Sequence, residues 1–340
     1  MMYTRSASAL LLFITILTSC QSKSRYVHNE GMIFGTIYHL SYESPQGEDL
    51  HEGVKAELDH FNQSLSTYDP NSVISKVNSN RDTVLDRYFT TVFKKAEKVS
   101  EITDGAFDIT VAPMVNVWGF GFKNKENVTE ALIDSLKALV GYQKVKLIDG
   151  KIVKEHPNTM LDCSAIAKGY GVDVVAAYLR GQGCKNYMVE IGGEVVTRGV
   201  NPKGESWNIG ISTPDENSFF KEQQMQAIVG LSNKALATSG NYRNFYVEDG
   251  KKYAHTIDPH TGYPVQHSLL STTVLADSCM TADAFATAFM VLGLDKSIEI
   301  ASQVPEIEVY FIYADEDGKY RSYFSEGFKS LIKEEFNVQQ

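Results

Sequence analysis

The sequence lacks several features that define large classes of proteins. Its 340 residues include only four cysteines, with no Cys-x-x-Cys pair and no Cys/His spacing of a zinc site. Lys and Arg number 32 against 42 Asp and Glu, so the basic excess that nucleic-acid binders use to displace counterions is absent. There is no internal repeat and no apolar run of about 20 residues, the length of a membrane-spanning helix. These absences leave a globular protein of one large or two modest domains that binds no nucleic acid. The net charge of −10 is an average, which leaves room for a locally basic ligand pocket.

The N-terminal residues are typical of a targeting signal. Arg5 precedes a short apolar run, Ala9–Leu17, as in a secretory signal peptide. Leu17-Thr18-Ser19-Cys20, followed by polar residues, resembles the lipobox of bacterial lipoproteins; the alternative is an ordinary signal peptide with an incidental cysteine. Acyl chains on Cys20 would hold the protein in the cell envelope, lipid-anchored and facing the periplasm. The predicted parts are a signal peptide over residues 1–19, a lipidated Cys20 with a tether over residues 20–30, and one functional domain over residues 31–340.

The remaining cysteines, Cys163, Cys184 and Cys279, are odd in number, which argues against a disulfide framework. We expect three buried apolar thiols.

Hydrophobic periodicity predicts helices and strands in clusters rather than in regular alternation, which favours an α+β fold over a doubly wound sheet. Gly169 and Gly171 lower the helix propensity of one predicted helix and therefore indicate a packing or ligand constraint there. The expected helices cover residues 49–65, 89–103, 129–139, 165–182 and 282–292. The expected strands cover residues 33–42, 145–148, 151–153, 187–191, 195–198, 207–211, 226–231, 245–248, 270–276, 309–313 and 320–324.

Asp283 and Thr287 are four residues apart on a predicted helix, so their side chains share one face. A carboxylate and a hydroxyl on one face can coordinate a hard cation if other oxygens complete the shell. Two oxygens do not make a metal site. On spacing alone, the favoured interpretation is therefore that Asp283 is a charge near the helix N-terminus and Thr287 an ordinary helical residue.

Asp162, Ser164 and Lys168 surround the start of another predicted helix, where backbone N–H groups favour phosphate. Capping by Asp162 or Ser164 and a solvated Lys168 are equally compatible with the sequence. Thr238-Ser239-Gly240 and Arg243 could bind an anion or form a polar turn.

His255 precedes a predicted turn and could be catalytic or structural. Aromatic side chains near these segments could enclose a flat ligand or simply fill the core. They are Tyr68, Phe107, Trp118 and Phe120. Together the polar segments indicate a pocket for phosphate and a divalent cation, and hence a nucleotide-like ligand.

Read together and in order, these segments resemble the FAD:protein FMN transferases, bacterial flavin-transferring lipoproteins. Each match is weak alone, but their shared order behind a lipobox is specific, and they span nearly all of the chain beyond Phe34. The matching segments are Ser66-Thr67-Tyr68, Gly105–Thr110, Asn116–Gly121, Asp162–Tyr170, Glu190–Gly193, Ala237–Arg243, His255–Gly262 and Ala282-Asp283-Ala284 with Thr287.

The resemblance implies FAD in a cleft between two α+β subdomains, with mainly antiparallel sheets flanked by helices. It also implies Mg²⁺ held by Asp283, Thr287 and the carbonyl oxygen of Ala165. FAD contacts would come from Phe34, Tyr68, Ala106, Phe107, Asp108, Asp162, Lys168 and Ile257. Phe34 departs from the family, whose members often carry Met there, but it keeps an apolar face.

The implied reaction moves FMN from FAD to a Ser or Thr hydroxyl of an acceptor protein, and AMP leaves. Asp283 and His255 are the candidate bases for the hydroxyl proton. The implied acceptor is a subunit of a membrane redox complex that carries a short Ser/Thr motif. Two alternatives stay open: a pyrophosphatase that gives free FMN and AMP, and a flavin-binding lipoprotein without catalysis.

Overall fold

The computed structural model describes residues 25–122, 127–214, 224–241, 245–248 and 251–336. The predicted signal peptide, Cys20 and Arg243 lie outside the described residues. Within the described ranges, every helix is too short or too polar to cross a bilayer.

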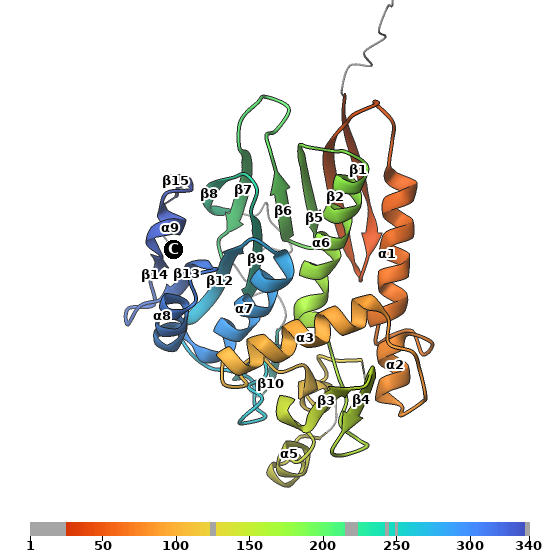
Figure 1. The fold of residues 1–340 in the computed structure, drawn as a ribbon. Coiled ribbons are helices and arrows are strands. Elements are labelled where there is room, and N and C mark those ends of the chain that lie inside the picture. The colour runs from red at the N-terminus through yellow and green to blue at the C-terminus, as the bar shows by residue number, and fades with distance from the viewer. Residues whose placement is uncertain (1–24, 123–126, 215–223, 242–244, 249–250, 337–340) are drawn as a thin grey trace, which may run out of the picture.

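One antiparallel sheet of eight strands organises the molecule, in the order β1-β2-β5-β6-β9-β12-β13-β14 (Figure 1). Smaller sheets are β15-β8-β7, β3-β4 and β10-β11. The strands are β1 (Arg25–Ile33), β2 (Thr36–Ser44), β3 (Val145–Ile148), β4 (Lys151–Lys154), β5 (Tyr187–Ile191), β6 (Glu194–Arg198), β7 (Trp207–Ser212), β8 (Met225–Leu231), β9 (Ala235–Gly240), β10 (Phe245–Glu248), β11 (Lys251–Ala254), β12 (Leu269–Ala276), β13 (Glu308–Ala314), β14 (Tyr320–Phe324) and β15 (Ile332–Glu335).

Helices cover one face of this sheet and build a smaller part beside it (Figure 1). The α-helices are α1 (His51–Leu65), α2 (Val73–Asn78), α3 (Arg87–Ile102), α4 (Ala112–Val117), α5 (Glu130–Lys137), α6 (Ser164–Gly181), α7 (Cys279–Leu292), α8 (Leu294–Gln303) and α9 (Glu326–Lys329), and two 3₁₀ turns cover Ile109–Val111 and Tyr142–Lys144. The α+β class expected from the sequence is confirmed, as are the buried, unpaired Cys163, Cys184 and Cys279.

The three-stranded sheet packs across the other face of the large sheet. Trp207, Ile209 and Ile211 alternate along β7 as buried residues and join one apolar cluster with Val195 and Leu236 of the large sheet. This period of two is what places the inner face of β7 against β6 and β9.

Two strand boundaries differ from the sequence-based prediction. Residues 25–30, expected in the tether, belong to β1 and pair along their whole length with β2. The predicted strand over 33–42 is interrupted by Phe34 and Gly35, which have φ angles of 54° and 74° and make a two-residue hairpin turn. The alternation of β1 was hidden because both of its faces are only partly buried.

Helices α6 and α7 pack at a distance that only glycine permits at the crossing. A Cβ on Gly169 would lie 2.4 Å from the Cys279 carbonyl oxygen and 2.7 Å from Asp283 Cβ. A Cβ on Gly171 would lie 2.8 Å from the Phe34 ring. The expected packing reason for these two glycines is therefore present.

The start of α7 is fixed by a residue of α6. Asp173 accepts hydrogen bonds from the backbone N–H groups of Cys279 and Met280, both at 2.9 Å, and from Ser278 Oγ at 2.7 Å. This long-range cap begins α7 at Cys279, three residues before the predicted start at Ala282. No local pattern could have indicated it, because donor and acceptor are about a hundred residues apart.

We expect Gly169→Ala to destabilise the fold, because the new methyl group would meet backbone and force α6 and α7 apart. Overpacking of this kind costs about 1–3 kcal/mol. Gly181→Ala is the matched control: it lies on the same helix with open space around its Cβ position and should gain about 0.5–1 kcal/mol. Urea unfolding of both variants measures the difference, and equal stabilities would contradict this account of the crossing.

Candidate active site

A cavity of about 940 Å³ lies between the large sheet and the smaller part of the molecule. Its volume falls in the range of small-molecule sites. The lining joins segments distant in sequence: Ala106–Ile109, the start of α6, the β5–β6 turn, β7, β9, His255–Ile257 and the inner face of α7.

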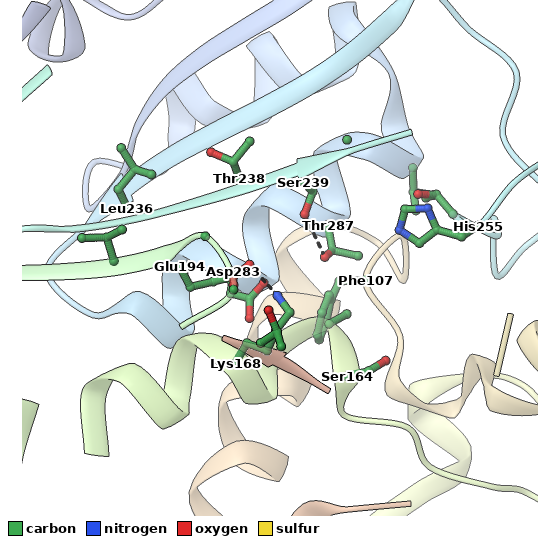
Figure 2. Close-up of a pocket in the computed structure, with 18 of the residues that line it drawn as sticks. Phe107, Ser164, Lys168, Glu194, Leu236, Thr238, Ser239, His255, Asp283 and Thr287 are labelled. Atoms are coloured by element: carbon green, nitrogen blue, oxygen red, sulfur yellow. Dashed lines mark hydrogen bonds and ion pairs between the residues drawn. The ribbon is translucent and has the colours of Figure 1, made fainter. Parts of the chain in front are cut away.

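Three charged side chains meet on the wall made by α6, β6 and α7 (Figure 2). Lys168 Nζ lies 2.5 Å from Glu194 Oε1, and Glu194 is only 3% exposed. Asp283, also buried, lies beside this pair (Figure 2). Glu194 Oε2 is buried without a hydrogen-bond partner among the described residues, so this carboxylate is only half satisfied.

The electrostatics of this cluster follow from burial and from two neighbouring acids. Burial raises the pKa of Glu194, the Asp283 carboxylate raises it further, and Lys168 only partly offsets both. Burial disfavours the Lys168 cation, but Glu194 and Asp283 outweigh that cost and raise its pKa, so Lys168 stays charged. The cluster with all groups ionised has one negative charge in excess.

Asp283 and Thr287 lie one turn apart on α7 and face the cavity. Asp283 Oδ2 accepts the Gly169 N–H at 2.9 Å, and Thr287 Oγ1 lies 3.4 Å from Ser239 Oγ. Ala165 lines the same wall. These are hard oxygen donors, which suit Mg²⁺. No group of three or more His, Cys, Asp or Glu suited to a metal occurs among the described residues, so hydroxyl, carbonyl or ligand oxygens would have to complete a shell.

Asp108 and Asp162 also line the cavity. Asp108 accepts from Thr110 N and Tyr142 N, both at 2.7 Å, and from Thr110 Oγ1 at 2.6 Å, which folds the 106–110 loop onto itself. Asp162 Oδ1 accepts from Ser164 N at 2.8 Å at the start of α6. Burial raises the pKa of both carboxyls. Ser164 is the first residue of α6 and is exposed, so it does not cap the helix as the sequence allowed.

His255 lines the cavity on the side away from the charged cluster (Figure 2), and Ile257 is also part of the lining. The His255 ring lies edge-on to Phe120, with centroids 6.4 Å apart. Phe107 and Phe120 also line the cavity, whereas Trp118 is buried and donates Nε1–H to the Gly262 carbonyl. Trp118, one of the aromatic residues that could have enclosed a ligand, therefore belongs to the core.

The structure does not bring Phe34 and Tyr68 into the cavity lining. Phe34 sits in the β1–β2 turn and packs against Phe61, with ring centroids 5.3 Å apart. Tyr68 is 78% exposed in the loop after α1. The predicted FAD residues that do share the cavity are Ala106, Phe107, Asp108, Asp162, Lys168 and Ile257, together with the predicted metal residues Ala165, Asp283 and Thr287.

The polar turn that the sequence allowed at Thr238-Ser239-Gly240 is a strand in the structure, and these three residues line the cavity. These residues end β9, an inner strand of the large sheet, and pair with Ser271–Thr273 of β12. Their small polar side chains resembled a turn, but β9 pairs with β6 and β12 and packs against α7.

Two cavity acids escaped the sequence analysis, Glu194 and Glu190. They flank Ile191, Gly192 and Gly193, and their charged partners, Lys168 of α6 and His39 of β2, are distant in the sequence. Glu190 Oε2 lies 2.6 Å from His39 Nδ1 of β2, and its Oε1 accepts from Gly193 N at 2.6 Å.

Comparisons with known proteins show which family this chain resembles along most of its length. A model described as "ApbE family" matches residues 34–311. The "FAD:protein FMN transferase" of Vibrio cholerae is 37% identical over 95% of this chain and 97% of its own length, and that of Haemophilus influenzae is 38% identical over 93% and 94%.

Solved structures of flavin transferases have a similar fold. "Flavin Transferase ApbE from Vibrio cholerae" superposes with a TM-score of 0.82 at 36% identity, over 91% of this chain and 99% of that one. The apo flavinyl transferase ApbE of Pseudomonas stutzeri gives 0.81 at 31% identity, over 92% and 98%. With a family match over most of its length and relatives well above 30% identity, this chain belongs to the ApbE family.

Proposed function

We propose that this chain is an enzyme that transfers FMN from FAD to a Ser or Thr hydroxyl of an acceptor protein. The acceptor Oγ attacks the FMN phosphorus, the bond from that phosphorus to the bridging oxygen breaks, and AMP leaves with that oxygen. The acceptor hydroxyl gives up its proton, and the product is a phosphodiester-linked flavin. The names of the relatives from Vibrio cholerae and Haemophilus influenzae support the reaction.

The observation that carries the proposal is the placement of Lys168, Asp283 and Thr287 on one wall of a cavity large enough for a nucleotide. A pyrophosphate brings negative charge, which a cluster with an excess negative charge would repel. We propose that Asp283, Thr287 and the Ala165 carbonyl hold Mg²⁺, which would reverse the sign of this wall. Bound Mg²⁺ supplies charge neutralisation and polarises the attacked phosphorus.

The protein's own groups have separable roles in this scheme. Glu194 fixes Lys168 by its 2.5 Å ion pair, so that the ammonium group faces the cavity at a constant position. Gly169 N–H orients Asp283. His255, on the other side of the cavity, is the better candidate for accepting the hydroxyl proton, since Asp283 is committed to the metal.

The acceptor is proposed to be a redox protein subunit of a membrane complex with a Ser/Thr flavinylation motif. Hydrolysis of FAD to FMN and AMP would use the same wall. An aromatic lid formed by Tyr68 would shield the cavity from water and favour transfer, but Tyr68 is exposed outside the cavity lining, so the structure does not support such a lid. Product analysis therefore decides between transfer and hydrolysis.

We further propose that Cys20 carries a lipid and holds the domain at the envelope membrane. Strand β1 begins at Arg25, so residues 21–24 separate it in the sequence from the proposed lipidation site at Cys20. Such a segment reaches on the order of 15 Å, which would keep β1 close to the bilayer.

We expect Asp283→Ala to lower the rate of Mg²⁺-dependent FMN transfer by at least about 100-fold, because a lost interaction of about 2.7 kcal/mol in the transition state has this effect. Mass spectrometry of an acceptor domain incubated with FAD and Mg²⁺, with and without EDTA, measures the adduct. Asp277→Ala is the matched control, since that side chain is 87% exposed near the start of the same helix. Full activity of Asp283→Ala would overturn the metal assignment, and free FMN without adduct would favour hydrolysis.

His255→Ala should lower kcat by about 10²–10⁴-fold and remove the rising limb of the pH–rate profile, as loss of a general base does. His260→Ala is the control, because His260 is 60% exposed and outside the cavity lining. A variant that is slower but keeps the same pH profile would assign His255 to binding or structure instead.

Cys20→Ser should move the protein from the membrane fraction to the soluble envelope fraction, while FAD binding persists. Ser24→Ala, downstream of the lipobox, should leave the distribution unchanged. Fractionation followed by immunoblotting measures both, and membrane retention of Cys20→Ser would rule out this anchor.

A further inference from the structure

About a third of the residues that line the cavity have no assigned ligand in the scheme above. Those residues come from β2, β5, the β5–β6 turn and β7, and none is among the expected FAD or metal contacts. They are Thr36, Ile37, His39, Met188, Glu190, Gly192, Gly193 and the five consecutive residues 208–212. A transferase needs a place for a second substrate, and this part of the cavity is continuous with the charged wall through Gly193 and Glu194.

Five consecutive residues of one strand line the cavity, which identifies the edge of β7 rather than one of its faces. A face would contribute only alternate residues, because successive side chains point to opposite sides. Strand β7 lies at the end of the order β15-β8-β7 and, among the described residues, pairs with β8 alone. Its outer edge therefore borders the cavity.

The register shows which backbone groups that edge presents. Gly230 N donates to Leu331 O and Phe336 N donates to Gln226 O, both at 2.8 Å, so even-numbered residues of β8 face β15. The odd-numbered residues of β8 then bond to their partners in β7, which include Ile209 opposite Val229. By the alternation of an antiparallel ladder, the N–H and C=O groups of Asn208 and Gly210 point to the cavity.

Gly210 lets another backbone come close, since it has no side chain. Across the cavity, the space around the Cβ position of Gly193 is open, and the His39–Glu190 pair stands beside this turn. The opening is thus bounded by strand backbone on one side and by a glycine turn on the other, which suits an extended peptide.

We propose that the outer edge of β7 binds an extended segment of the acceptor protein as an added strand. Main-chain hydrogen bonds at Asn208 and Gly210 would fix the segment's register, and its Ser or Thr hydroxyl would then be presented to the phosphate-binding wall. This inference rests on the proposed function, because it concerns the second substrate of the same site. Recognition through backbone groups requires an unfolded or loop segment and tolerates different side chains around the hydroxyl.

Gly210→Pro tests the inference, because proline removes an edge donor without breaking the β7–β8 ladder. The nearest atoms to its new Cβ belong to the flexible, half-exposed side chain of Met225, 3.0 Å away. Asn208→Pro is a second variant at the next outward amide.

His28→Pro is the matched control. Gly192 N donates to Ile37 O and Glu43 N donates to Asn186 O, so odd-numbered residues of β2 face β5. His28 lies opposite Ser41, and its N–H therefore points outward at the far edge of the large sheet, away from the cavity.

The assay uses the full chain purified in detergent, with FAD, Mg²⁺ and membranes from a strain of the source organism that lacks this protein. Covalent flavin fluorescence of membrane proteins in denaturing gels gives the transfer rate. Flavin fluorescence quenching gives FAD affinity, and thermal unfolding monitors the fold.

We expect Gly210→Pro and Asn208→Pro to label acceptors at least tenfold more slowly than His28→Pro, with FAD affinity within about twofold of the parent chain. Labelling at the parent rate would overturn the edge-docking proposal while leaving the transferase intact. Loss of FAD binding or of the folded state in both variants would also overturn it, because the edge would then serve the flavin or the fold. Absence of labelling by the parent chain would instead overturn the proposed function.

Discussion

The close contact between α6 and α7 is the constraint on which the site depends. Gly169 allows the helices to touch at the level of Asp283, and its N–H binds that carboxylate. Asp173, one helical turn further along α6, caps α7 and so fixes where that helix begins. Lys168 on α6 and Asp283 and Thr287 on α7 are therefore placed by a single helix–helix contact.

The cluster of Lys168, Glu194 and Asp283 reduces the stability of the fold but suits the proposed binding of a pyrophosphate. Two buried carboxylates share one cation, and one carboxylate oxygen of Glu194 has no partner among the described residues. Buried groups left half satisfied reduce stability, and such groups concentrate where a ligand completes them. The Lys168 cation and an added divalent ion on the same wall would together complement the negative charge of a pyrophosphate. They would replace the water that solvates the pyrophosphate in solution.

Two sheets border the cavity, and in the proposed scheme each would bind one substrate. The large sheet and its helices provide the charged wall proposed for the nucleotide, and the three-stranded sheet contributes an edge to the same cavity. Packing of Trp207, Ile209 and Ile211 against the large sheet brings that edge beside the charged wall. A transfer reaction gains from this arrangement, since holding both reactants in one geometry lowers the entropic part of the barrier.

The sequence by itself determined the α+β class, most helices, the strands on either side of residues 149–150 and several of the residues that line the cavity. Those features depend on local periodicity, turn chemistry and short motifs, which are written within a few residues of one another. Tertiary structure alone decided that Thr238–Gly240 form an inner strand, that Asp173 starts α7, and that Phe34 and Tyr68 lie off the cavity lining. It also decided that Glu194 pairs with Lys168 and that the edge of β7 borders the site. Each of these joins residues far apart in the chain, and no local pattern encodes which distant backbone or charge will be brought into contact.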